Sequence, residues 1–142
     1  MRPMRPRSRF RNYVTLEALV VTGVLLAFHF IPVKEKAALV AGTLFLLSTA
    51  FILAYESRFP GFTKRATFWG ALIFLLASAI PIFTLRLMNW GIPFDQLSLL
   101  GVPAAQWHQF SNYLFLILVV CFFIDDYLWK QELFKRDELS QK

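Results

Sequence analysis

The chain has 142 residues, of which 57% are hydrophobic and only 17% are charged, below the roughly 25% of an average soluble domain. One soluble domain of this length cannot hide so much apolar surface, so the composition predicts an integral membrane protein. The net charge of +6 comes from basic residues that lie between apolar segments, which is typical of membrane orientation signals and excludes nucleic acid as a partner.

The first 12 residues form a basic arm with five arginines, two prolines and no acidic residue. The prolines disfavour a stable helix before Ser8. We interpret this arm, residues 1–12, as a topology signal; the alternative is an arm that binds anionic lipids or the acidic face of a partner. The apolar run over residues 13–31 has no small-residue cleavage site after it, so it predicts an uncleaved first membrane helix.

The second span is predicted over residues 37–55, directly after a tight turn at 33–36. So short a turn makes the second helix run antiparallel beside the first. The two helices carry pairs of small residues four positions apart, namely Gly23 with Ala27, Ala38 with Gly42, and Ala50 with Ala54. Small residues let membrane helices approach closely, so we expect the first two helices to pack through these faces.

The third and fourth spans are predicted over residues 67–88 and 107–129. Pro81 lies inside the third span and predicts a kink, because a proline removes one helix hydrogen bond. The fourth span has a short apolar centre, reaches a tryptophan at each end, and runs on into a charged cytoplasmic tail, residues 131–142. Together the spans predict an all-α, polytopic domain of four transmembrane helices over residues 13–130.

The distribution of lysine and arginine predicts how these spans are oriented. Twelve of the 15 basic residues lie in the N-terminal arm, around the loop at 59–66 or in the C-terminal tail. The other three, Lys34, Lys36 and Arg86, lie on the opposite side. Because cytoplasmic segments are enriched in basic residues, we expect a multi-pass protein of a bacterial inner membrane with both termini in the cytoplasm.

One long connection, residues 89–109, joins the third and fourth spans on the outer side. It is rich in aromatic and aliphatic residues and carries a single charge, Asp95. Connections this long are often functional. Within it, residues 94–100 predict a short interfacial helix that lies along the membrane surface.

Two roles stay open for the apolar side chains of this connection. The first is a cap on the bundle, with Phe94, Leu97 and Leu100 on one helix face turned toward the bilayer. The second is a surface for a membrane protein partner, centred on Trp90 and Trp107, since exposed aromatic patches tend to mark interfaces.

Three acidic residues near the cytoplasmic side are candidate binding groups. Glu17 lies early in the first span, and Asp125 and Asp126 lie near the end of the fourth. A charge at mid-bilayer costs roughly 2.5–3.5 kcal/mol, so such residues are candidates for a proton or cation site. The alternative is that they pair with nearby basic residues, namely Arg11, Lys64, Arg65 and Lys130.

Two histidines, His29 and His108, are expected at similar depth near the outer side, where the two axial ligands of a b-type haem would stand. We expect interfacial hydrogen bonding for them, and neither a cofactor nor a metal. Cys121 is the single cysteine, which excludes a disulfide within the chain and predicts a small apolar residue. The sequence contains no glycine-rich phosphate loop and no HExxH or GxSxG motif.

These patterns favour a non-catalytic subunit or assembly factor of a membrane complex. The alternative is a small ion-coupled transporter or channel that uses Glu17, Asp125 and Asp126. A glutamate early in the first of four helices resembles the small multidrug exporters, although the strong charge bias and the long outer connection of this chain depart from that family. No continuous polar stripe crosses the predicted spans, since polar residues cluster at their two ends.

Overall fold

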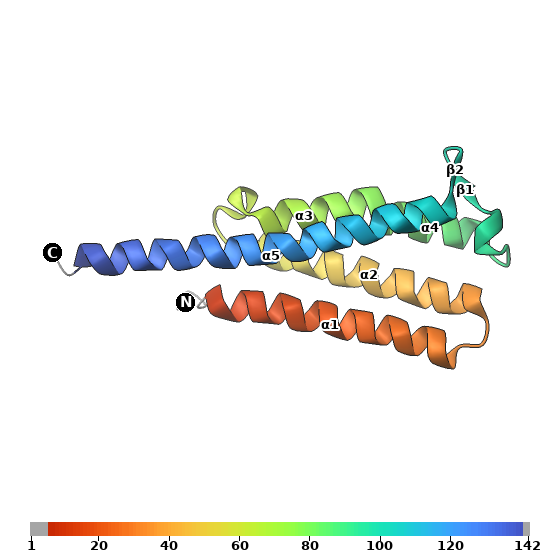
Figure 1. Ribbon diagram of the computed structural model, residues 1–142, viewed down its shortest axis with the longest axis horizontal. Coiled ribbons are helices and arrows are strands. Elements are labelled where there is room, and N and C mark those ends of the chain that lie inside the picture. Colours follow the sequence, from red (N-terminus) through yellow and green to blue (C-terminus); the bar gives the residue numbers. More distant parts are fainter. Residues whose placement is uncertain (1–5, 141–142) are drawn as a thin grey trace.

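Four long helices lie side by side in the computed structural model, which describes the backbone of residues 6–140 and the side chains of residues 9–132 (Figure 1). Each helix is long and apolar enough to cross a membrane. The candidate spans are Arg9–Phe30, Lys34–Glu56, Ala66–Met88 and Ala104–Glu132. The four predicted spans are thus confirmed as long apolar helices.

The elements are α1 (Pro6–Phe30), α2 (Lys34–Glu56), the 3₁₀ turn η1 (Phe62–Lys64), α3 (Ala66–Phe74), the π turn η2 (Leu75–Ala79), α4 (Ile80–Met88), the 3₁₀ turn η3 (Phe94–Gln96), β1 (Ser98–Leu99), β2 (Val102–Pro103) and α5 (Ala104–Ser140). The start of α1, the turn η1 and the last turns of α5 share one end of the bundle, here named the terminal end (Figure 1). The α1–α2 turn and the β1–β2 hairpin share the other, the hairpin end.

The N-terminal end of the chain is more helical than the sequence predicts, whereas the last helix runs on into the charged tail as predicted. α1 begins at Pro6, so residues 6–12 of the predicted arm are its first turns. A proline fits the first turn of a helix because its missing N–H would have no helical partner there. α5 continues to Ser140 and includes most of the predicted tail. Residues 1–5 and 141–142 lie outside the described part of the chain.

The predicted distortion at Pro81 takes the form of a π turn. In the five residues of η2 the helix widens, and the N–H of Ile80 donates to the carbonyl oxygen of Leu75, five residues back. Pro81 cannot donate to Ala77, and its ring would clash with that carbonyl group in a regular α-helix. A wider turn just before the proline relieves this clash, so α3, η2 and α4 form one continuous span.

Close approaches between the helices occur at glycines, only partly as predicted. A Cβ added to Gly23 of α1 would lie 3.1 Å from Leu44 Cδ1 of α2, in agreement with the predicted α1–α2 packing. Gly42, predicted to face α1, instead meets α4, because its added Cβ would lie 3.3 Å from Phe83 Cδ2. The tightest site was not predicted: at Gly70 of α3 the Cβ would lie 2.9 Å from Cys121 Sγ of α5.

The core lies between the helices and leaves most of their outer faces apolar. Ile52, Phe74, Leu118 and Phe122, from α2, α3 and α5, are buried there. Large aliphatic side chains point outward along the helices; Leu25 of α1, for example, is 66% exposed. Apolar surface on the outside as well as the inside is typical of helices that pack in lipid.

The predicted interfacial helix over residues 94–100 is replaced by a 3₁₀ turn and a hairpin. η3 covers only Phe94–Gln96, and β1 then pairs antiparallel with β2. Leu100 and Gly101 form the connecting turn, with φ angles of 54° and 77°. Seven residues are too few for a stable isolated helix, and positive φ at both turn residues gives a tight hairpin. The predicted all-α class is therefore corrected at this one place.

Candidate functional site

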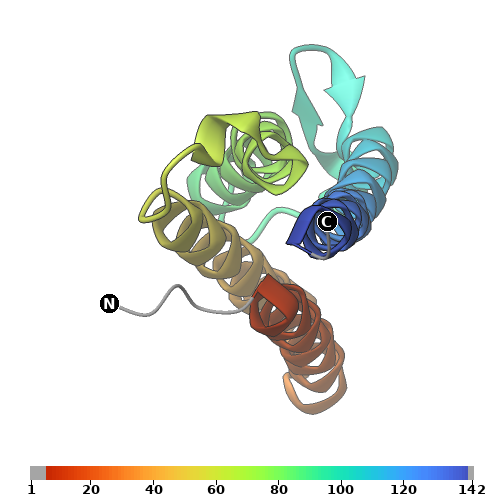
Figure 2. The same ribbon diagram turned by 90° about the vertical axis from the view of Figure 1, so that its left-hand side faces the viewer.

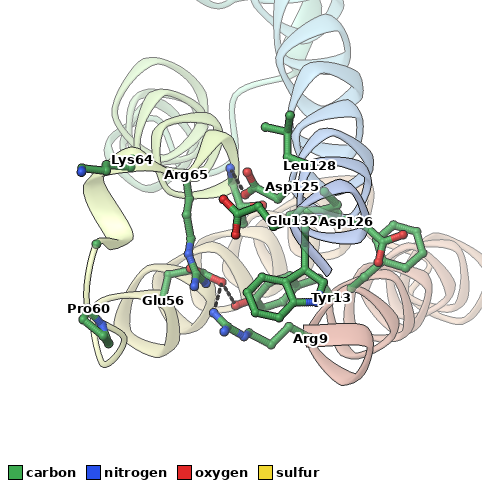
Figure 3. A pocket seen from close by; sticks show the side chains of 15 residues that line it. Arg9, Tyr13, Glu56, Pro60, Lys64, Arg65, Asp125, Asp126, Leu128 and Glu132 are labelled. Atoms are coloured by element: carbon green, nitrogen blue, oxygen red, sulfur yellow. Dashed lines mark hydrogen bonds and ion pairs between the residues drawn. The ribbon is translucent and has the colours of Figure 1, made fainter. Parts of the chain in front are cut away.

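A cavity of about 330 Å³ opens at the terminal end of the bundle, between the first turns of α1 and α3, the end of α2 and residues 122–132 of α5 (Figure 3). Its wall is strongly charged. It carries the basic residues Arg9, Lys64 and Arg65 and the acidic residues Glu56, Asp125, Asp126 and Glu132.

Glu56, the last residue of α2, is the centre of this cluster and is only 2% exposed. The hydroxyl group of Tyr13 on α1 donates to Glu56 Oε1. Arg65, just before α3, donates from Nη1 to Glu56 Oε2 at 2.8 Å. Because a buried carboxylate needs donors of this kind, one side chain ties α1, α2 and the start of α3 together (Figure 3).

Two arginines lie against the ring of Phe59, in the loop after α2. The guanidinium carbon of Arg9 is 3.9 Å from the ring centroid, and that of Arg65 is 5.7 Å away. Arg9 Nη1 is 4.0 Å from Glu56 Oε1, and the buried Nε and Nη1 atoms of Arg9 have no hydrogen-bond partner among the described residues. Charge attraction and a cation–π contact therefore hold Arg9 in place.

Asp125 of α5 caps the N-terminus of α3. Its Oδ1 accepts from the backbone N–H of Ala66 at 3.0 Å, and its Oδ2 accepts from that of Thr67 at 2.8 Å. The first N–H groups of a helix lack partners within the helix, and their positive end attracts a carboxylate. The cap comes from a distant part of the chain, so it also fixes α3 against α5.

The other two predicted acids have separate positions. Asp126 pairs with Lys130 at 2.6 Å, so the predicted pairing along α5 is confirmed. Glu17 is 4% exposed and lies one helical turn beyond Tyr13, outside the set of residues that line the cavity. The structure gives Asp125 and Asp126 partners within the protein and places Glu17 apart from the cavity wall.

The five residues predicted as a cap or a partner surface divide into two groups. Leu97 is buried against Leu85 of α4 and Ala104 of α5, and Phe94 packs on the same cluster. Trp107 is half-buried, and its indole N–H donates to the carbonyl oxygen of Leu99 at 3.1 Å. These contacts match a cap that closes the hairpin end of the bundle.

Trp90 and Leu100 form the second group and face outward. Trp90 is 53% exposed, and Leu100, at the tip of the hairpin, is 89% exposed. The hairpin projects away from the four helices in both ribbon views (Figures 1 and 2). Neither side chain therefore contributes much to the packing of its own chain.

The two histidines each contact a phenylalanine. His29 in the last turn of α1 lies edge-on to Phe30, and His108 near the start of α5 lies edge-on to Phe94, with centroids 4.8 and 4.4 Å apart. The C-terminal end of α1 and the N-terminal end of α5 are well separated in both views (Figures 1 and 2). The structure therefore does not place the two histidines as a facing pair.

Among the described residues, no group of three or more His, Cys, Asp and Glu side chains is placed to hold a metal ion. Three of the four carboxylates on the cavity wall already have partners: Glu56 with Tyr13 and Arg65, Asp125 with the α3 backbone, and Asp126 with Lys130. The partners of Glu56 and Asp125 belong to other segments of the chain, so these two carboxylates join helices to one another.

The fold and this site define a four-helix chain with four candidate membrane spans, joined by an ionic cluster at one end. No protein-family model, curated protein or solved structure matches the chain.

The central part of the cluster, namely Glu56 with Tyr13, Arg9 and Arg65, was not predicted from the sequence. One signal was present, since Glu56 directly ends an apolar run of about 20 residues and would need a partner at that depth. The identity of the partner was not readable, because Tyr13 lies 43 residues away and its direction depends on how α1 is rotated about its axis.

Proposed function

We propose that this chain is a multi-pass protein of a bacterial inner membrane, with both termini in the cytoplasm. Four long apolar helices with outward aliphatic side chains support insertion into a bilayer. Arg9, Lys64 and Arg65 at the terminal end, against few basic residues at the hairpin end, support this orientation. Basic side chains at this end would also contact the headgroups of anionic lipids.

The orientation is tested by two single cysteines placed in a Cys121→Ala background. A membrane-impermeant thiol reagent applied to intact cells should label a cysteine at Ser98, in the hairpin, and should not label one at Ser140, at the end of α5. Both should be labelled once the cells are permeabilised, which controls for accessibility. Labelling at Ser140 but not at Ser98 in intact cells would reverse the proposed orientation.

Within the membrane, we propose that the protein is a non-catalytic subunit or assembly factor that binds an integral membrane partner through its hairpin end. The observation that carries this proposal is Leu100. It is 89% exposed at the tip of the hairpin, and its φ of 54° lies in the left-handed region. A leucine in that region costs roughly 1–2 kcal/mol more than a glycine.

Leu100 offers no packing within its own chain to offset this cost, which supports a contact outside the chain. Trp90, the other outward-facing residue of the five predicted as a cap or a partner surface, adds a large aromatic surface of the kind that is enriched where proteins bind. The partner surface that fits these two side chains is apolar and lies at the level where the spans end.

Two substitutions test this proposal: one should abolish partner binding without loss of stability, and the other should lower stability without a direct effect on partner binding. Leu100→Asn fits the left-handed turn and removes the exposed side chain, so thermal stability of the purified protein should be unchanged or slightly raised. A stoichiometric membrane partner that co-purifies with the wild type in mild detergent should be lost from this variant.

Leu97→Ala is the matched control, because Leu97 is a buried leucine of the same connection. Its loss should lower the free energy of unfolding by about 2–3 kcal/mol, without a direct effect on the partner surface. The proposal is wrong if the wild-type protein purifies without a partner, or if Leu100→Asn retains the partner at full stoichiometry.

A further inference from the structure

Glu17 is a buried carboxyl group that the terminal-end cluster does not use. Its side chain lies within the membrane-crossing part of α1 and is 4% exposed. Both of its oxygen atoms are buried and have no hydrogen-bond partner among the described residues. An ionised carboxylate without donors in such a place would cost several kcal/mol, which a neutral carboxylic acid largely avoids.

The one polar side chain that interacts with Glu17 among the described residues is an uncharged serine. Ser48 of α2, 5% exposed, lies beside the carboxyl group. The hydroxyl proton of Ser48 is donated to the carbonyl oxygen of Phe45 at 3.2 Å. A hydroxyl group can donate or accept, so Ser48 is a single neutral partner that can serve either state of Glu17 and brings no charge to balance a carboxylate.

The ionisable groups of the neighbouring helices face other partners. Tyr13 on α1 and Glu56 on α2 bind each other, and Asp125 on α5 accepts from the backbone of α3. Cys121 on α5 packs on Gly70 of α3. No charged side chain of the described residues compensates a negative charge on Glu17.

We propose that Glu17 is a proton-binding site in the interface between α1 and α2, occupied as the neutral carboxylic acid and reached from the terminal-end cavity. Tyr13 lines that cavity and precedes Glu17 by one helical turn, about 6 Å along the axis. Glu17 therefore lies about one helical turn from the wall of the cavity. This inference is independent of the proposed role as a subunit.

The test uses dicyclohexylcarbodiimide, an apolar reagent that enters membranes and reacts with protonated carboxyl groups. The acid proton moves to one nitrogen of the carbodiimide and a carboxyl oxygen adds to its central carbon; the acyl group then migrates to nitrogen. The product is a stable N-acylurea that carries the mass of one carbodiimide, and no other reactant is needed.

The full-length protein in membrane vesicles should gain one label, which peptide mass mapping assigns to Glu17. The label should form at mildly acidic pH, decline as the pH is raised, and be absent in Glu17→Gln. Asp95→Asn, which removes an exposed acid, should keep the label. Because the site is mapped on the wild-type protein, the result does not depend on whether a variant folds.

Two results would overturn the proposal. The first is a wild-type protein that is labelled only at other acids or is not labelled at all, which means that Glu17 is not a protonated carboxyl group that can be reached from outside the bundle. The second is protection of Glu17 by sodium at constant pH, which would assign the site to a metal cation instead of a proton.

Discussion

Glu56→Ala is expected to lower the free energy of unfolding by about 3 kcal/mol, at the lower end of the range for breaking a buried ion pair. The substitution leaves the Arg65 guanidinium and the Tyr13 hydroxyl group without their acceptor, and it removes the charge nearest to Arg9. Arg65 is 24% exposed and can regain some water, which moderates the loss. The midpoint of thermal unfolding in a fixed detergent measures the effect.

Asp126→Ala is the matched control, since it removes the same charge from the wall of the same cavity. Asp126 pairs with a lysine that is 55% exposed, so its loss should cost only about 0.5 kcal/mol. Glu56→Gln should be intermediate, because it keeps an acceptor for Tyr13 while losing the charge that holds Arg65. Equal small losses for Glu56→Ala and Asp126→Ala would mean that the cluster does not hold the helices together.

Gly70→Ala is expected to cost about 2 kcal/mol, even though alanine is normally the better helix former by about 1 kcal/mol. The new Cβ would lie 2.9 Å from Cys121 Sγ, 3.2 Å from Cys121 Cβ and 3.5 Å from Leu118 Cα. Because two of these atoms are close to or in the backbone of α5, the contact can be relieved only by moving α3 and α5 apart. The same thermal measurement detects the loss.

The double variant Gly70→Ala with Cys121→Ala should recover much of this loss, because it removes the sulfur atom that makes the shortest contact. Gly42→Ala is the second control. Its Cβ would meet only the Phe83 side chain, whose ring edge at 3.3 Å can shift, so the variant should be neutral or slightly more stable. A destabilised Gly42→Ala beside an unaffected Gly70→Ala would contradict the packing described for α3 and α5.

The four helices were predictable from the sequence because the length of an apolar run is a local property of the chain. The pairing of Asp126 with Lys130 was predictable for the same reason, since residues four apart share a helix face. The helix that packs on Gly42 was not predictable, because either α1 or α4 can pack on that face of α2.

The candidate site was less predictable than the helices. Glu17, Asp125 and Asp126 stood out as acids within apolar spans, yet the partners of Glu17 and Asp125 depend on tertiary contacts, with Ser48 and with the backbone of α3. The hairpin was missed because Leu100 is an unusual residue for a turn with positive φ. A glycine or asparagine at that position would have indicated the hairpin directly.

The C-terminal part of α5 extends well beyond its last contact with α3. Asp125 caps the N-terminus of α3, and from this residue α5 continues without a break to Ser140, roughly 22 Å farther on. In Figure 1 this segment extends beyond the ends of the other helices. A small tilt of α5 about Asp125 would become a larger displacement at the far end of the helix. A change of packing inside the bundle would therefore move the C-terminal segment of the chain.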